Sequence, residues 1–276
     1  IKMYPVILEI GPIKIYSFGL MLVTAFYTCY GLLYLEMKRL KYDTEIASDI
    51  IFWSAVGGVL GAKIYYLIEN LDRTIQDPMG MIFSGSGLVF LGGLIGSIIC
   101  VSIVLKNRNL PWYLFADIIA PLIMIGYAIG RLGCFLVGDD YGLPSSLPWA
   151  VSFPEGLPPT TISSFAAYYP WIDTSGINSE VFKVHPTQLY ESAVGILLFF
   201  FLWSRRKKNQ RAGTMFFSYL LLAGIERFFI EFLRTNEKYL FDTFSGAQMI
   251  SFLMIFVGSY FLLFPILNTN VEKVPK

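Results

Sequence analysis

The fold class of this chain is decided by residues 118–137, which read IIAPLIMIGYAIGRLGCFLV. The stretch is long enough to cross a bilayer, which takes roughly 20 apolar residues in a helix. Arg131 is its only charged residue. An arginine inside a membrane segment costs on the order of 2.5–3.5 kcal/mol, so it usually faces a cavity or a partner rather than lipid. We therefore expect the functional site to lie around Arg131.

The composition of the whole chain indicates the same class, because 55% of its 276 residues are hydrophobic and only 15% are charged. The 21 basic residues barely exceed the 20 acidic ones, so there is no basic excess to neutralise nucleic-acid phosphates. We expect a single integral membrane domain over residues 1–276, an all-α polytopic membrane protein with seven transmembrane helices. The expected spans are about 15–35, 46–68, 87–105, 111–137, 187–204, 212–233 and 246–267.

Basic residues cluster at alternating ends of these spans. The clusters are Lys38, Arg39 and Lys41; Lys106 and Arg108; Arg205, Arg206, Lys207, Lys208 and Arg211; and Lys273 and Lys276. The positive-inside rule makes those ends cytoplasmic. The N-terminus is then outside, the C-terminus is cytoplasmic, and residues 138–186 form a small extracytoplasmic cap. Six prolines that precede Pro186 in this cap predict that it contains no regular helix.

Small residues recur at helical spacing in three of the spans. The pairs Gly57/Gly61, Gly92/Gly96 and Gly126/Gly130 predict close helix packing rather than a ligand loop. Cys29, Cys100 and Cys134 show no zinc or disulfide spacing. Neither a metal nor a cofactor is expected.

Three groups of polar residues border the apolar spans, and all three fall at the outer side of this topology. They are Arg131 with Asp139, Asp140 and Gly142; His185, Gln188, Tyr190 and Glu191; and Arg227, Glu231 and Arg234. Pro186 suits the first turn of a helix, so His185, Gln188 and Glu191 would share one face. Arg227, Glu231 and Arg234 would form one charged stripe.

Each group also has a purely structural interpretation. Arg227 and Glu231 could neutralise each other, and Arg234 could snorkel to the interface. His185 could bond at a helix entry, and Gln188 and Tyr190 could bond a neighbouring helix. The functional interpretation rests on two arginines at membrane depth without enough nearby carboxylates, which suggests an absent anion. Because arginine binds phosphate through a planar donor array, a phospholipid phosphate is the expected ligand.

Several segments match a known family in order and spacing. They include Gly92-Gly93-Leu94-Ile95-Gly96, Gly130-Arg131-Leu132-Gly133, His185-Pro186-Thr187-Gln188-Leu189-Tyr190-Glu191, and Arg227-Phe228 with Glu231 and Arg234. Through them the chain resembles the prolipoprotein diacylglyceryl transferases. The resemblance implies transfer of the diacylglyceryl group of phosphatidylglycerol to the lipobox cysteine thiol of a secreted prolipoprotein, releasing glycerol phosphate. It also implies a bacterial cytoplasmic membrane, a site toward the outer face, and Arg131 and Arg227 as the phosphate-binding arginines.

Four positions depart from the pattern of that family. Leu91 stands where the family has histidine, Cys134 where it has asparagine, Phe18 where it has tyrosine, and Asp139 where it usually has glutamate. A thiol with a pKa of about 8.5 is mostly protonated at neutral pH, so its attack needs a base. Because Leu91 accepts no proton, the candidates are His185, Glu191 and Asp139. The expected substrate-binding positions are Gln188, Tyr190, Glu231, Arg234, Gly142, Cys134, Leu91 and Phe18.

Two functional hypotheses follow. The first is a diacylglyceryl transferase that keeps the phosphate-binding arginines. The second is a diverged paralogue that uses a different acceptor, or binds phospholipid or lipoprotein precursor without turnover. The retained charges at membrane depth favour catalysis. For Cys134, a lipid-accepting nucleophile is one interpretation, and a small buried hydrophobe is the one that we favour.

Overall fold

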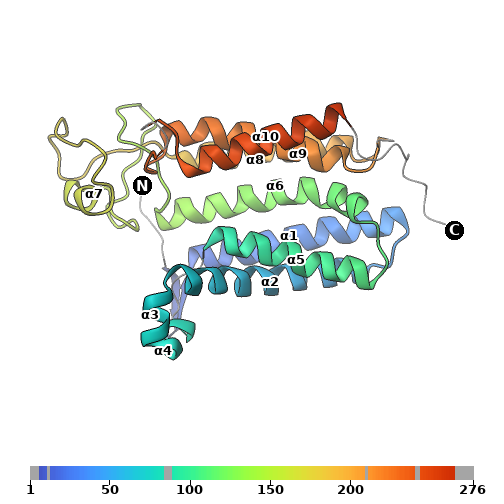
Figure 1. The fold of residues 1–276 in the computed structure, drawn as a ribbon. Helices are drawn as coiled ribbons and strands as arrows, with labels where there is room; N and C mark the ends of the chain where they lie inside the picture. Colours follow the sequence, from blue (N-terminus) through green and yellow to red (C-terminus); the bar gives the residue numbers. More distant parts are fainter. Residues whose placement is uncertain (1–5, 11–12, 84–88, 209–210, 240–242, 265–276) are drawn as a thin grey trace. The chain divides into compact units, whose positions relative to one another are not determined.

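The structure is a computed structural model that describes residues 6–10, 13–83, 89–208, 211–239 and 243–264 (Figure 1). Within these residues, six helices are long and apolar enough to cross a membrane. They are α1 (Ser17–Leu40), α2 (Glu45–Glu69), α5 (Phe90–Asn107), α6 (Trp112–Val137), α8 (Thr187–Arg205) and α10 (Gly246–Leu263). The structure is therefore mostly helical, and six of the seven expected spans are candidate membrane spans by length and composition.

The expected span at 212–233 is helical over a shorter stretch. Helix α9 covers Thr214–Ile230, which is 17 residues, and a 3₁₀ turn, η1, covers Glu231–Leu233. Asp117 of α6 accepts hydrogen bonds from the backbone N–H groups of Gly213 and Phe216, both at 2.8 Å. This carboxylate satisfies donors at the helix start that have no partner within the helix.

Four short elements were not predicted from the sequence. Strands β1 (Val6–Ile10) and β2 (Ile13–Tyr16) pair antiparallel and precede α1. Helices α3 (Leu71–Gln76) and α4 (Pro78–Phe83) follow α2. Each is shorter than the apolar runs from which the spans were read, so hydropathy alone gives no signal for it.

The chain divides into two compact units, residues 30–115 and residues 1–29 with 116–276, and each is described by itself. In the first of these, α2 packs closely on α5 at glycines. A Cβ atom on Gly57 would meet the Gly96 carbonyl, and one on Gly61 would lie 2.9 Å from the Cα of Gly96. The predicted glycine packing is thus confirmed for these helices, whereas Gly130 of α6 has nothing within 4 Å of an added Cβ.

In the other unit, α6, α8, α9 and α10 carry the cap at one end (Figure 1). Helix α8 approaches α6 at Gly195, where an added Cβ would lie 3.1 Å from Ala128 Cβ. Helix α9 packs against both α8 and α10. These contacts bring the C-terminal ends of α6 and α9 and the N-terminal end of α8 to the base of the cap (Figure 1).

The cap has a hydrophobic core of its own. The buried ring of Tyr141 stacks on Phe153 and Phe165, with centroid distances of 5.4 and 5.9 Å. The expectation that prolines exclude regular helix here is wrong, because α7 spans Ile162–Tyr168. The Thr161 hydroxyl caps α7 by accepting from the Ser164 N–H. The seven residues of α7 fit between neighbouring prolines, so the proline spacing limits its length without preventing it.

Candidate active site

Glu191 of α8 is completely buried and lies at the centre of the charged residues. Its Oε1 accepts hydrogen bonds from Arg227 Nη1 at 2.9 Å and from the Tyr127 hydroxyl at 3.0 Å. Its Oε2 lies 3.2 Å from Arg131 Nε and 3.4 Å from Arg234 Nη1. One carboxylate therefore contacts arginines from α6, from α9 and from the segment after η1.

Asp140 and Glu231 complete the network. Asp140 lies 2.7 Å from Arg131 Nη1 and 2.9 Å from Arg234 Nη2. Glu231 Oε2 lies 2.7 Å from Arg227 Nη2. The expectation that the arginines lack nearby carboxylates is therefore wrong. The pairing of Arg227 with Glu231, which helical spacing had offered as the structural interpretation, is present. The carboxylates that pair with Arg131 are distant in sequence or follow the end of its helix, so helical spacing did not reveal them.

The arginines differ in exposure. The Arg234 side chain is 5% exposed, whereas those of Arg131 and Arg227 are 15% and 22% exposed. Arg234 also donates to the Asp140 carbonyl at 3.1 Å, so protein groups surround its guanidinium. Arg131 and Arg227 are thus the cations of this network that an external anion reaches most readily.

The expected helical stripe of Arg227, Glu231 and Arg234 is kept only by Arg227 and Glu231, which pair at i, i+4 spacing. Helix α9 ends at Ile230, Glu231 begins η1, and Arg234 is extended. Arg234 forms an isolated antiparallel bridge with Gly142 of the cap. The three side chains still meet, because Arg234 contacts Glu231 from beyond the end of the helix.

The segment from His185 to Glu191 also differs from the expectation. Helix α8 starts at Thr187, so His185 lies outside it and the expected shared face is confined to Gln188 and Glu191. Gln188 Nε2 donates to the Asp139 carbonyl at 2.5 Å, which holds the backbone that leads to Asp140. The Tyr190 hydroxyl accepts from Trp149 Nε1 at 2.7 Å.

Two of the candidate bases retain buried polar atoms without a hydrogen-bond partner among the described residues. They are Asp139 Oδ1 and His185 Nδ1. Burial, followed by the nearby charge of Asp140, raises the pKa of Asp139 to about 6. Burial lowers the pKa of His185. Glu191 is already paired with cations, so it is the least suitable base of the three.

Gly142 packs closely against the segments on either side of it. Its N–H donates to the His185 carbonyl at 2.9 Å. A Cβ atom on Gly142 would meet the Leu233 carbonyl and would lie 2.7 Å from Thr187 Cγ2. This close approach holds the cap backbone against the segment that carries Arg234.

Three of the positions that depart from the family pattern, Cys134, Phe18 and Leu91, lie in surroundings that differ from one to the next. Cys134 is buried, with its Sγ 3.9 Å from Arg131 Nη1. Phe18 of α1 lies against Gly133 of α6, where an added Cβ would be 3.2 Å from the Phe18 ring. Leu91, in the first turn of α5, belongs to the unit of residues 30–115 and is 38% exposed.

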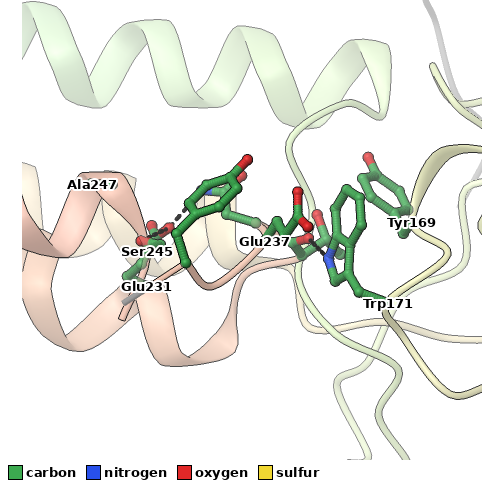
Figure 2. Close-up of a pocket in the computed structure, with 10 residues that line it drawn as sticks. Tyr169, Trp171, Glu231, Glu237, Ser245 and Ala247 are labelled. Atoms are coloured by element: carbon green, nitrogen blue, oxygen red, sulfur yellow. Dashed lines mark hydrogen bonds between the residues drawn. The ribbon is translucent and has the colours of Figure 1, made fainter. Parts of the chain in front are cut away.

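A cavity of about 340 Å³ lies beside Glu231 and was not predicted (Figure 2). We call it the α10 cavity, and its lining residues are Tyr169, Trp171, Glu231, Thr235, Asn236, Glu237, Tyr239, Ser245, Gly246 and Ala247. Figure 2 shows Trp171 and Tyr169 across from the start of α10. Residues of the cap and of the segment after η1 form it together, so no local sequence pattern marks it.

Comparison with known proteins identifies related chains. The family model described as prolipoprotein diacylglyceryl transferase matches residues 5–264. Proteins named phosphatidylglycerol–prolipoprotein diacylglyceryl transferase are similar over most of their length. That of Clostridium tetani is 31% identical over 94% of this chain and 96% of its own. Those of Oceanobacillus iheyensis and Staphylococcus xylosus are 32% and 34% identical, over 94% and 92% of this chain and 87% and 86% of their own.

Proposed function

The chain belongs to the prolipoprotein diacylglyceryl transferase family, and we propose that it transfers the diacylglyceryl group of phosphatidylglycerol to the lipobox cysteine thiol of a prolipoprotein. Glycerol phosphate is the second product. The observation that carries this proposal is the convergence of Arg131 and Arg227 on Glu191, with both arginines still partly exposed. Such a pair can bind the phosphate of a lipid whose tails remain in the bilayer.

The proposed topology has seven spans, with α9 as the sixth. The N-terminus and the cap lie outside, and the C-terminus is cytoplasmic. Basic residues at the ends of α1, α5 and α8 support this orientation in a bacterial cytoplasmic membrane. Arg131, Glu191 and Arg227 then lie toward the outer face, where the lipobox of a secreted preprotein is accessible.

Phosphate binding must compete with the carboxylates already paired to the arginines. Asp140 is the carboxylate that the phosphate displaces, because its side chain is 47% exposed while those of Glu191 and Glu231 are 0% and 1% exposed. Glu191 then keeps the arginines in position. The three arginines then face the phosphate, Glu191 and Glu231, so the net charge around them stays close to zero when the lipid is bound.

In the reaction, the cysteine sulfur forms a bond to the glyceryl carbon that carries the phosphate. The carbon–oxygen bond breaks, and its electron pair leaves with the phosphate oxygen. Arg131 and Arg227 stabilise that charge in a site with little water. Asp139 takes the thiol proton, because its Oδ1 is buried without a described hydrogen-bond partner and burial raises its pKa to about 6, closer to neutral pH than that of an ordinary carboxyl group.

The second candidate function is phospholipid or precursor binding without turnover, or use of another acceptor. The specific observation that favours it is the apolar character of Leu91 and Phe18 at positions where the family carries polar side chains. The charged network around Glu191 favours catalysis instead, since a binding scaffold does not require it.

The test uses purified protein, phosphatidylglycerol labelled in its diacylglyceryl group, and a lipobox peptide. The same peptide with serine in place of cysteine is the matched control. We expect label on the cysteine peptide alone, together with released glycerol phosphate. Bound phosphatidylglycerol with no label on the cysteine peptide would contradict the transfer and support the second candidate.

A further inference from the structure

The α10 cavity lies beside the residues to which the proposed transfer assigns roles, and it borders the arginine network through one side chain, that of Glu231. Glu231 is almost fully buried, and its Oε2 pairs with Arg227, which belongs to the proposed phosphate site. Its Oε1 accepts hydrogen bonds from Asn236 Nδ2 at 2.6 Å and from the Ser245 hydroxyl at 2.7 Å. Glu231 therefore contacts cavity-lining residues through one oxygen and pairs with Arg227, the proposed phosphate-binding arginine, through the other.

The walls of the cavity combine aromatic faces with polar groups. Trp171 Nε1 donates to the Thr235 carbonyl at 2.8 Å, which ties the cap to the segment after η1. Tyr169, Trp171 and Tyr239 offer ring surface, while Asn236 and Glu237 offer hydrogen-bonding atoms. A volume of about 340 Å³ is within the range of small-molecule sites, roughly 300–1,000 Å³.

The charge of these walls selects among possible ligands. Arg227 and Arg234 neutralise the charge of Glu231, so a ligand in the cavity does not need a positive charge to pair with this carboxylate. A second carboxylate, that of Glu237, also lines the cavity. An anion would face these carboxylates, whereas an uncharged hydroxylated group can use the donors, the acceptors and the ring faces together.

From this arrangement we infer that the α10 cavity seats the glycerol headgroup of the donor lipid. The inference rests on the proposed function, in which Arg131 and Arg227 hold the lipid phosphate. The headgroup glycerol is esterified to that same phosphate, so it is the hydroxylated group closest to Glu231. The cavity then determines which phospholipid is used, and the arginines do not.

A larger side chain at Gly246 tests the cavity, because this residue is part of its lining. It lines the cavity at the first position of α10, and no described atom lies within 4 Å of an added Cβ. Gly246→Leu therefore places a side chain in open space without a backbone clash. Gly176 of the cap is the matched control, because it too has nothing within 4 Å and lies outside the cavity.

The measurement compares two donors with the same diacylglyceryl group and the same phosphodiester charge, phosphatidylglycerol and phosphatidylmethanol. We expect the wild type and Gly176→Leu to prefer phosphatidylglycerol by about tenfold in kcat/KM, since phosphatidylmethanol lacks the headgroup hydroxyls. In Gly246→Leu this ratio falls toward one. An unchanged ratio, or a change only in the KM of the peptide, would overturn the inference, and the latter would assign the cavity to the acceptor.

Binding measurements keep this inference separate from the proposed function. If the wild type transfers from neither lipid, the proposed function fails, and the binding ratio of the two lipids in detergent decides the inference. A preference for phosphatidylglycerol that Gly246→Leu removes supports the headgroup site, and equal binding contradicts it. If Gly246→Leu does not fold, Glu237→Ala replaces it, with loss of the preference expected and an unchanged preference overturning the inference.

Discussion

Arg227 Nη1 lies 2.9 Å from Oε1 of Glu191, so α9 and α8 are joined by an ion pair whose carboxylate has no exposed surface. A buried charge is tolerated when it is paired and hydrogen-bonded. Glu191 meets that condition through Arg131 and Arg234 as well. The stability of this part of the fold and the position of the proposed phosphate-binding arginines therefore depend on one side chain.

Glu191→Gln tests that dependence. The amide keeps the shape of the side chain but no longer neutralises the arginines, and removing one partner of a buried pair costs about 3–5 kcal/mol. We expect a clearly lower Tm in detergent, together with loss of transfer. Glu180→Gln, at an exposed position of the cap, is the control and should keep both. An unaltered Tm in Glu191→Gln would show that the arginines do not need this carboxylate.

Asp139→Asn tests the assignment of the base. A base must be deprotonated to act, and the pKa of Asp139 is raised to about 6. Transfer by the wild type should therefore rise with pH up to about 6 and fall about tenfold per pH unit below it. In Asp139→Asn the rate should be low, and the decrease of the rate below pH 6, the acid limb of the pH profile, should be absent. Asp173→Asn, the control, should keep the wild-type profile. If the limb persists in Asp139→Asn and disappears in His185→Gln, the base is His185.

Gly142→Ala tests whether this glycine acts through packing. The added methyl would meet Leu233 and Thr187, and overpacking costs about 1–3 kcal/mol. We expect a lower Tm and a higher KM for phosphatidylglycerol, because the bridge between Gly142 and Arg234 shifts. Gly176→Ala should change neither value. A Gly142→Ala protein with a normal Tm and no phosphatidylglycerol binding would instead indicate direct contact with the lipid.

The sequence predicted the helices well, since apolar runs of the required length carry a strong signal even without knowledge of their contacts. Residues at the helix ends were predicted less well. Arg234 was expected on one helical face with Arg227, but α9 stops at Ile230. His185 was expected on one face with Gln188 and Glu191, but α8 starts at Thr187, as its predicted span did.

The candidate residues of the site were found because charges in apolar segments stand out, but of their pairings only that of Arg227 with Glu231 was anticipated. Arg131 meets Glu191 across 60 positions of sequence, and such a contact follows from tertiary packing rather than from helical spacing. Tyr127, one helical turn before Arg131, was overlooked although its position on the same face was readable. The roles of all these residues stay predictions.

The central claim, that Arg131 and Arg227 hold the lipid phosphate during transfer, is tested by measuring transfer from phosphatidylglycerol to the lipobox peptide. The proteins to compare are the wild type, Arg131→Ala, Arg227→Ala and, as a control at an exposed position of α3, Arg73→Ala. Removing one group that stabilises the developing charge should lower kcat by about 10²–10³. We expect that loss in Arg131→Ala and Arg227→Ala, and wild-type rates in Arg73→Ala. Wild-type rates in either Arg131→Ala or Arg227→Ala would contradict the account.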